Sequence, residues 1–298
     1  MAQDLSRGRA TDLIPEHVLV HVPGFTAGDM TAQAARLHGG TVNASFRVDT
    51  SAGRFVARIH APAAQMLGAN HEREAQLHAA AAAAGLAPAL IHVDRDYRFM
   101  IMEYAAGAIW TSQDFARPDR LTQLGGALHA LHAVVPPAVA PYDVPAMLKR
   151  HYDRLLAAAP NEGAWLAQLM DRAAAAVEAC GSAQRPKAFI HNDLYHSNLI
   201  GSERIYLLDW EYAAVSDPLL DLASVLAYHP QAAPYAQTLL DATRLASVAS
   251  LEMLRQATWL FVLLSYFWYR SRRLAGAATS APSAGDLAAE QALLKRLQ

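Results

Sequence analysis

Strand-forming residues cluster near the start of the chain. Residues 42–48 and 54–60 are rich in β-branched, aromatic and alternating positions, and residues 49–53 between them (Asp-Thr-Ser-Ala-Gly) have the composition of a turn. This pattern predicts a β-hairpin. Residues 93–104 carry a second group of strand formers around an Asp-Arg-Asp turn, which predicts two further strands ending at Glu103 and Tyr104.

Helical periodicity dominates the rest of the chain. Residues 70–84 contain no helix breaker before Gly85, which predicts a helix with a glycine stop. Apolar residues recur at helical spacing in residues 121–131 and 145–180, and another helical stretch covers residues 236–272. A loop over residues 274–286 and a last helix over residues 286–297 complete the prediction.

Two short apolar runs interrupt the helical part. Residues 188–191 and 205–209 each end in a polar side chain, as strands do when their tips carry chemistry. The pattern therefore predicts an α+β protein with a small β-rich lobe over residues 1–104 and a larger, mainly helical lobe over residues 105–298.

Composition narrows the classes of partner. The chain has 298 residues, 53% of them apolar, and 25 Lys and Arg against 27 Asp and Glu. A chain of this kind can bury a sizeable core, but it has no positive field to attract nucleic acid or an anionic membrane. The first residues lack the apolar stretch of a signal peptide, Cys180 is the single cysteine, and the apolar residues 259–269 are fewer than the ~20 needed to span a bilayer. We expect a cytoplasmic protein that binds neither nucleic acid nor membrane.

One motif carries the chemistry. His191-Asn-Asp-Leu-Tyr-His-Ser-Asn198 has the form HxDxxxxN, and the next apolar run ends at Asp209. Phosphoryl transfer needs a carboxylate to accept the proton of an attacking hydroxyl, and Asn and Asp to hold the magnesium that bridges the phosphates. This pattern predicts Asp193 as the base and Asn198 and Asp209 as Mg²⁺ ligands. The alternative is that these side chains only cap helices or lie in surface turns.

These residues resemble a known family. The motif at 191–198, the stretch Leu208-Asp-Trp-Glu-Tyr-Ala213, and Asp217-Pro-Leu-Leu-Asp221-Leu resemble the choline and thiamine kinase branch of the aminoglycoside phosphotransferase-like superfamily. The resemblance runs from about Leu37 to about Arg273. It implies a two-lobed protein-kinase-like fold and an ATP- and Mg²⁺-dependent kinase of small hydroxylated molecules.

The resemblance also assigns the nucleotide site. It makes His38-Gly-Gly-Thr-Val-Asn43 a glycine-containing nucleotide-binding loop, Arg58 the phosphate-pairing cation, and Glu74 (or else Glu72) its partner on the following helix. It implies further that His191 and Asp221 support the catalytic loop structurally. The implied nucleotide-binding residues are Gly39, Gly40, Asn43, Arg58, Glu74, Glu103 and Tyr104.

The acceptor alcohol should bind in the helical lobe. A cationic acceptor of the choline type would need aromatic faces and a carboxylate, for which the candidates are Glu211, Tyr212, Trp259, Tyr266 and Trp268. Aromatics at helical spacing can equally be helix core. Choline kinases commonly have a second tryptophan three residues after the first, whereas this chain has Val262 there, so a thiamine-like, amino-alcohol or sugar-derived hydroxyl stays open.

Other chemistries lack their motifs. The chain has thirteen histidines but no HExxH, and one cysteine cannot form a thiolate zinc cluster, so we predict no zinc site from motifs. No GxSxG elbow indicates a serine hydrolase. The remaining alternatives to a metabolite kinase are an aminoglycoside-modifying kinase and a nucleotide-binding pseudokinase.

Overall fold

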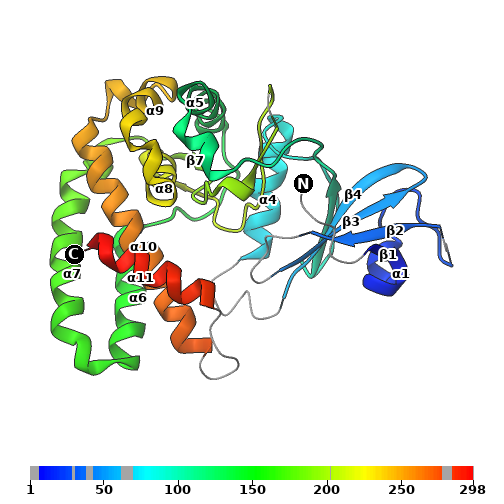
Figure 1. Cartoon of the computed structure of the whole chain (residues 1–298), viewed down its shortest axis with the longest axis horizontal. Coiled ribbons are helices and arrows are strands. Elements are labelled where there is room, and N and C mark those ends of the chain that lie inside the picture. The colour runs from blue at the N-terminus through cyan, green and yellow to red at the C-terminus, as the bar shows by residue number, and fades with distance from the viewer. Residues whose placement is uncertain are drawn as a thin grey trace. The chain divides into compact units, whose positions relative to one another are not determined.

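The chain folds into two compact units. The computed structural model describes residues 7–28, 31–37, 43–61, 70–201, 203–276 and 284–297. Met1–Thr111 and His196–Ala213 form the first unit, and Ser112–Tyr195 and Ala214–Gln298 form the second (Figure 1). The lobe boundary after residue 104 stays a prediction, because units defined by contacts need not coincide with functional lobes.

An antiparallel sheet forms the frame of the first unit. Its strand order is β1-β2-β3-β4-β6-β5. The predicted hairpin is confirmed: β3 and β4 pair from Ala44–Ile59 to Thr50–Gly53, so that only Ser51 and Ala52 form the turn. The strands are β1 (Arg7–Arg9), β2 (Gln33–Arg36), β3 (Ala44–Thr50), β4 (Gly53–Ile59), β5 (Leu90–Val93) and β6 (Phe99–Glu103).

The two faces of this sheet have different covers. Phe55 and Ala57 of β4 belong to a buried cluster with α1 (Ala10–Leu13) and α2 (Glu16–Leu19). The intervening side chains point to the opposite face, because successive residues of a strand alternate. On that face the side chains of β4 and β6 pack against Ala75 of α4 (His71–Ala83).

Helix α4 begins and ends as its sequence predicts. The side chain of Asn70 accepts a hydrogen bond from the Arg73 amide at 2.9 Å and so caps the first turn. At the other end Gly85 has φ of +74°, a conformation that favours glycine. The first turn therefore lies at a fixed position against the sheet, and it includes Glu74.

A short ribbon from later in the chain completes the first unit. It consists of the 3₁₀ turn η4 (His196–Asn198), β8 (Leu199–Ile200) and β9 (Tyr206–Leu207). The Leu199 carbonyl accepts from the Trp110 amide at 2.9 Å, and the Leu207 amide donates to the Leu86 carbonyl at 2.8 Å. These hydrogen bonds attach the ribbon to the segment that follows α4 and to the segment around Trp110.

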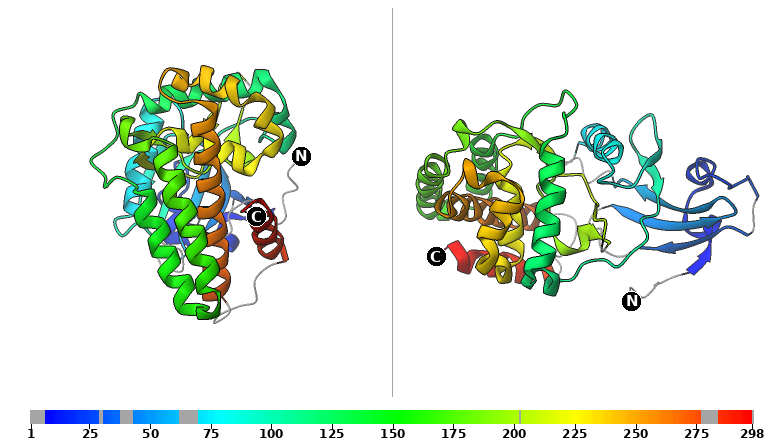
Figure 2. Two further views of the ribbon diagram at one scale, coloured as in Figure 1. Left: turned by 90° about the vertical axis from the view of Figure 1, so that its left-hand side faces the viewer. Right: turned by 90° about the horizontal axis from the view of Figure 1, so that it is seen from above.

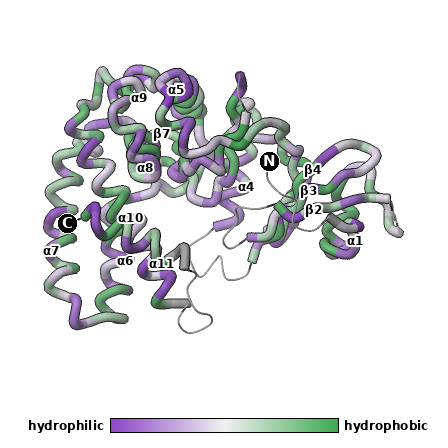
Figure 3. Tube along the Cα trace, in the orientation of Figure 1, coloured by the Kyte–Doolittle hydropathy of each residue, from purple (hydrophilic) through white to green (hydrophobic). Residues whose placement is uncertain are grey.

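Helices dominate the second unit. The long α10 packs against α6, α7, α8 and α11, and Figure 2 shows α6 and α7 lying along it. Apolar and polar residues alternate along these helices (Figure 3), and most of residues 259–269 are buried within α10, as predicted. The helices are α5 (Pro118–His132), α6 (Val144–Ala158), α7 (Gly163–Ala179), α8 (Leu219–Tyr228), α9 (Ala236–Ala242), α10 (Leu251–Gly276) and α11 (Ala284–Leu297).

Two predicted helical stretches are broken, and a predicted strand has a partner that was not predicted. Residues 145–180 divide at η2 (Pro160–Glu162), where Pro160 cannot donate a helical hydrogen bond. Residues 236–272 divide at Arg244, whose φ of +59° is left-handed. The predicted strand at 188–191 is present as β7 (Ala188–Ile190), which pairs with β10 (Ala214–Ser216). Within the described residues, no helix has the length and apolarity to cross a membrane.

Candidate active site

Arg58 lies at the centre of a charged cluster in the first unit. It pairs with Met100 on β6, and that register directs its side chain to the α4 face of the sheet. Its Nη2 atom is 2.6 Å from Asp209 Oδ1, 3.3 Å from Glu211 Oε2 and 3.4 Å from Glu74 Oε1. The predicted contact between Arg58 and Glu74 is therefore present, and one guanidinium joins β4, α4 and the segment after β9.

The electrostatics of this cluster favour the charged forms. Burial alone would lower the pKa of Arg58, but the carboxylates of Asp209, Glu74 and Glu211 together raise it. Burial would likewise raise the pKa of Glu74, yet the charge of Arg58, helped by His71 and His60, lowers it to about 2. Three carboxylates face one guanidinium, so the cluster carries an excess of negative charge that can attract a cation.

Asn43 connects the strand after the predicted glycine loop to the same cluster. Its amide nitrogen donates to Glu211 Oε2 at 3.1 Å, and its amide oxygen accepts from the Ala61 amide at 3.1 Å. Glu211 thus lies among the predicted nucleotide-binding residues, although its predicted role is to bind the acceptor. Gly39 and Gly40 fall outside the described residues.

Asn198 and Asp209 flank the same end of the β8–β9 ribbon. Leu199 pairs with Leu207, and the Leu208 amide donates to the Asn198 carbonyl at 2.8 Å. Asp209 itself adopts a left-handed φ of +65°, which is uncommon for a residue with a side chain. Amide and carboxylate oxygens are the ligands that Mg²⁺ prefers, and the surplus of carboxylates around Arg58 suits a divalent cation. The residues present therefore fit the predicted Mg²⁺ ion.

Strand β6 ends at Glu103 and Tyr104 follows it, at the backbone where the family resemblance implies that the adenine of the nucleotide binds. Their amides donate to the carbonyls of Ala89 and Arg54, at 2.9 and 3.2 Å. The guanidinium of Arg54 also lies over the Tyr104 ring, 5.5 Å from its centroid. Since the sheet already uses both amides, an adenine here would have to bond to carbonyl oxygens or to later amides.

The predicted base lies on a tightly held loop of the second unit. Asp193 is partly exposed, and its amide donates to Nδ1 of the fully buried His191 at 3.3 Å. Asp221, which is fully buried at the start of α8, accepts hydrogen bonds from the amides of Asn192 (2.7 Å) and His191 (3.3 Å). Asn192 has a left-handed φ of +64°, which turns the chain immediately before Asp193. The hydrogen bonding predicted for Asp221 is thus present.

Sequence reasoning missed His132 as a member of this arrangement. Its Nε2 lies 2.9 Å from Asp221 Oδ2. The two residues are 89 positions apart, and no local motif connects them. The last turn of α5 therefore also holds the carboxylate that anchors the loop.

The predicted acceptor residues on α10 are largely buried. Trp259 is 8% exposed, and the guanidinium of Arg172 lies over its ring, 4.1 Å from the centroid. Tyr266 is 1% exposed, contacts Trp165 edge-to-face at 5.7 Å, and has its pKa raised to about 12 by burial. Trp268 is only half-buried. Tyr212 is half-buried in the first unit, two residues from Trp210. Core packing thus accounts for the burial of Trp259 and Tyr266.

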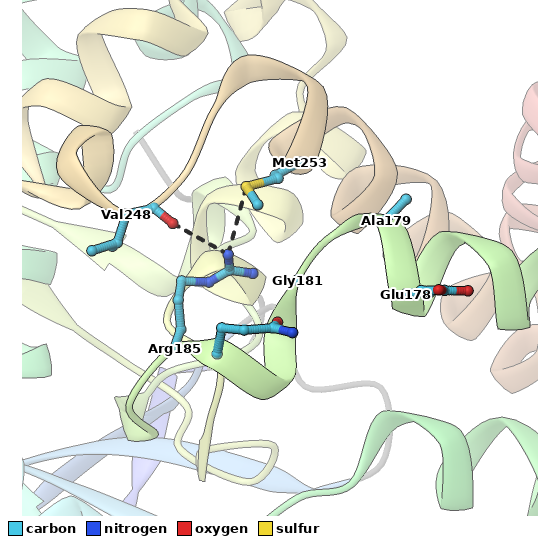
Figure 4. A pocket seen from close by; sticks show the side chains of 7 residues that line it. Glu178, Ala179, Gly181, Arg185, Val248 and Met253 are labelled. Carbon is cyan, nitrogen blue, oxygen red and sulfur yellow. Dashed lines mark hydrogen bonds between the residues drawn. The ribbon is translucent and has the colours of Figure 1, made fainter.

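A pocket of about 460 Å³ lies elsewhere in the second unit (Figure 4). Arg185, which borders it, donates to both carboxylate oxygens of Asp217 at 3.0 and 2.7 Å, and also to the Cys180 carbonyl. In Figure 4 its remaining nitrogen points to the Val248 carbonyl and the Met253 sulfur. The guanidinium is therefore engaged structurally, and none of the predicted site residues lines this pocket.

Comparisons with known proteins identify the family and the fold of the chain. A model of the phosphotransferase enzyme family matches residues 33–254. A choline/ethanolamine kinase family protein from Mesorhizobium loti has a similar structure (TM-score 0.75, 22% identity, covering 95% of this chain and 92% of that one). So does the choline kinase LicA from Streptococcus pneumoniae (TM-score 0.75, 16% identity, 96% and 98%).

A more distant likeness is to a spectinomycin phosphotransferase in complex with ADP and spectinomycin (TM-score 0.57, 12% identity, 89% of both chains). No curated protein matches the chain by sequence. These similarities confirm the protein-kinase-like fold that the sequence resemblance implied, with an antiparallel sheet followed by a mainly helical region.

Proposed function

The chain belongs to the phosphotransferase enzyme family, whose members transfer phosphoryl groups to small molecules, and we propose from this premise that it is an ATP-dependent kinase. Its acceptor is the hydroxyl of a small, cationic metabolite of the choline, ethanolamine or thiamine kind. The observation that carries the proposal is the Arg58 cluster, in which one guanidinium joins Glu74 to Asp209. A cation fixed by a helix carboxylate and placed beside a metal-binding carboxylate is what positioning of a triphosphate requires.

The proposed roles follow from the chemistry of each side chain. Asp193 orients the acceptor hydroxyl and takes up its proton as the oxygen attacks the terminal phosphorus. Asn198 and Asp209 hold Mg²⁺, which when bound neutralises charge on the phosphates. Arg58 pairs with phosphate oxygens, while Glu74 keeps its guanidinium in place. His191 and Asp221 support the loop on which Asp193 lies, and Asn43, Glu103 and Tyr104 complete the nucleotide site.

The acceptor class is supported by similarity of structure. Solved structures that resemble this chain include choline/ethanolamine, choline and ethanolamine kinases with TM-scores of 0.75, 0.75 and 0.69. Burial of Trp259 and Tyr266 argues that other groups bind the acceptor, among which Tyr212 and the half-buried Trp268 remain candidates.

A panel assay tests the proposal. ADP release from ATP and Mg²⁺ is measured with choline, ethanolamine, thiamine, spectinomycin and streptomycin, against a no-acceptor control. We expect turnover above that control with at least one of the three metabolites and none with the antibiotics. Turnover with an antibiotic alone would replace the acceptor class, and binding of ATP without turnover on any alcohol would favour a pseudokinase.

A further inference from the structure

Two histidines and a glutamate lie close together inside the first unit, although no sequence motif predicts this cluster. His60 directly follows β4, His71 is the first residue of α4, and Glu74 lies one turn later. All three are buried, with side-chain exposures of 2%, 4% and 2%. Glu74 Oε2 is 3.3 Å from His71 Nδ1 and 3.7 Å from His60 Nε2. Sequence reasoning found no zinc motif, because the two histidines are separated by ten residues and meet only in the folded unit.

The surroundings of His60 determine which of its ring nitrogens carries a proton. Its Nδ1 lies 2.7 Å from the Tyr97 carbonyl oxygen, which can only accept a hydrogen bond, so Nδ1 carries the proton. Burial lowers the pKa of His60 and favours the neutral ring. Its Nε2 then presents a lone pair, has no hydrogen-bond partner among the described residues, and faces the carboxylate of Glu74.

His71 supplies the second imidazole ring of this cluster. The rings of His60 and His71 are stacked with centroids 3.8 Å apart and planes 11° apart. The atom of His71 that faces Glu74 is Nδ1, within hydrogen-bonding distance of Oε2 at 3.3 Å, while His71 Nε2 has no partner within the described part of the chain. A buried lone pair facing a carboxylate is unfavourable unless a positive charge lies between them.

We propose that His60, His71 and Glu74 form a binding site for a divalent transition-metal ion, for which Zn²⁺ is the best match. Bonds of about 2.0–2.1 Å at tetrahedral angles place ligand atoms about 3.4 Å apart, close to the 3.3 and 3.7 Å separations found here. Imidazole ligands select zinc over magnesium, so this site is distinct from that of Asn198 and Asp209.

The surroundings support this assignment. Ligating histidines almost always donate their other ring N–H to a carbonyl or carboxylate, as His60 does to Tyr97. Three protein ligands leave the fourth position for a water molecule. Glu74 uses Oε2 for the metal and keeps Oε1 for Arg58, 3.4 Å away. The ion would thereby join the end of β4 to the start of α4 and fix the carboxylate that holds Arg58.

Direct zinc binding tests the site without any substrate, so its result is independent of the proposed kinase activity. The full-length protein is stripped with a chelator, dialysed against ZnCl₂ and analysed for zinc by mass spectrometry. We expect one zinc per chain, with affinity at least roughly 10-fold weaker in His60→Gln and in His71→Gln. His78→Gln is the matched control, because His78 is also buried on α4 but its Nε2 donates to the Pro88 carbonyl oxygen at 2.8 Å.

Thermal unfolding distinguishes a folded variant that no longer binds zinc from a variant that has misfolded. Zn²⁺ should raise the melting temperature of the wild type and of His78→Gln, but not of the other two variants, whose circular dichroism should stay native. Co²⁺ bound to the wild type should give the visible absorption bands of a four-coordinate site, which needs no variant. Zinc content well below one per chain, or full zinc content in both His60→Gln and His71→Gln, would overturn the proposal.

Discussion

Arg58 is the residue on which the charged cluster of the first unit depends. Its side chain is 11% exposed and compensates three carboxylates from two segments that are far apart in sequence, α4 and residues 209–211. Removing one partner of a buried ion pair leaves the other charge buried and uncompensated. The free energy of unfolding then falls by more than the intact pair contributes to it. The cluster therefore couples the local stability of β4, α4 and the Asp209 segment.

Replacing Arg58 by Met should lower the free energy of unfolding by about 3–5 kcal/mol. Urea denaturation followed by circular dichroism measures this. Arg98→Met is the matched control, because Arg98 pairs with Asp94 but its side chain is 66% exposed, and its loss should change stability by no more than about 1 kcal/mol. Adding Glu74→Gln to Arg58→Met should restore part of the loss. Equal effects of the two arginine variants would contradict the buried-cluster interpretation.

Glu74 should make the stability of the protein depend on pH. Its pKa falls from 4.5 to about 2 on folding. A depressed pKa contributes stability that is complete above the unfolded value and is lost as pH falls through the folded value. The contribution is roughly 3 kcal/mol at neutral pH, and it should decline between about pH 5 and pH 2.

Chemical denaturation at a series of pH values measures this dependence. The wild type should lose stability over that range more steeply than Glu74→Gln, which has no proton to bind at this position. Asp96→Asn, at an exposed carboxylate of the same unit, should leave the slope of the wild type nearly unchanged. Parallel pH profiles for the wild type and Glu74→Gln would contradict the lowered pKa.

At the scale of elements, Asp221 connects α8, α5 and the loop that carries Asp193. It is fully buried and accepts from two backbone amides, with His132 at 2.9 Å. Asp221→Ala should lower the free energy of unfolding by about 1–3 kcal/mol for each donor that stays buried and unpaired. It should also lower kcat, because the loop before Asp193 loses its anchor.

Denaturation and steady-state kinetics check both effects. Asp241→Ala is the control, because Asp241 is an exposed helix residue whose carboxylate is bound by Gln237. His132→Gln should have a smaller effect of the same kind, since it leaves the backbone contacts in place. A fall in stability without any change in kcat would show that Asp221 supports the fold alone.

Local signals explain which elements could be predicted from the sequence. The β3–β4 hairpin and α4 were recovered because alternation, a turn composition, Asn70 and Gly85 all lie within a few residues of the element they define. Strands β1 and β10 are three residues long and form only because distant segments pair with them, so periodicity could not reveal them. The break at Arg244 depends on its left-handed φ of +59°, a conformation that the identity of an arginine does not predict.

The same distinction applies to the site. Asp193, Asn198 and Asp209 follow from a motif with fixed spacing, and the Arg58–Glu74 contact follows from the family resemblance. Tertiary folding brings His132 beside Asp221 and His60 beside His71, and no rule of sequence spacing predicts either contact. The burial of Trp259 and Tyr266 also depended on tertiary packing, because a helical stripe of aromatics does not say what covers it.

At the scale of the whole molecule, the proposed catalytic motif is divided between the two units. Asp193 belongs to the second unit, whereas Asn198 and Asp209 belong to the first, with the change between Tyr195 and His196. The two halves have separate supports: Asp221 and His191 hold the loop of Asp193, and the β8–β9 ribbon carries Asn198 and Asp209. The proposed functions of the halves should therefore be separable by mutation.

Asp193→Asn should lower kcat by roughly 10²–10⁴-fold, because it removes the proposed general base, while the affinity for ATP changes little. Asp209→Asn should instead weaken Mg²⁺-dependent nucleotide binding, because it removes the carboxylate proposed to bind Mg²⁺, which also faces Arg58 at 2.6 Å. Calorimetry with Mg²⁺ and a non-hydrolysable ATP analogue measures binding, and ADP release with the acceptor found in the panel measures turnover. Asp153→Asn, at an exposed carboxylate of α6, is the control and should match the wild type in both assays. If Asp193→Asn turned over at the wild-type rate, the base would have to be another residue, because a proton acceptor cannot be removed without slowing the step it serves.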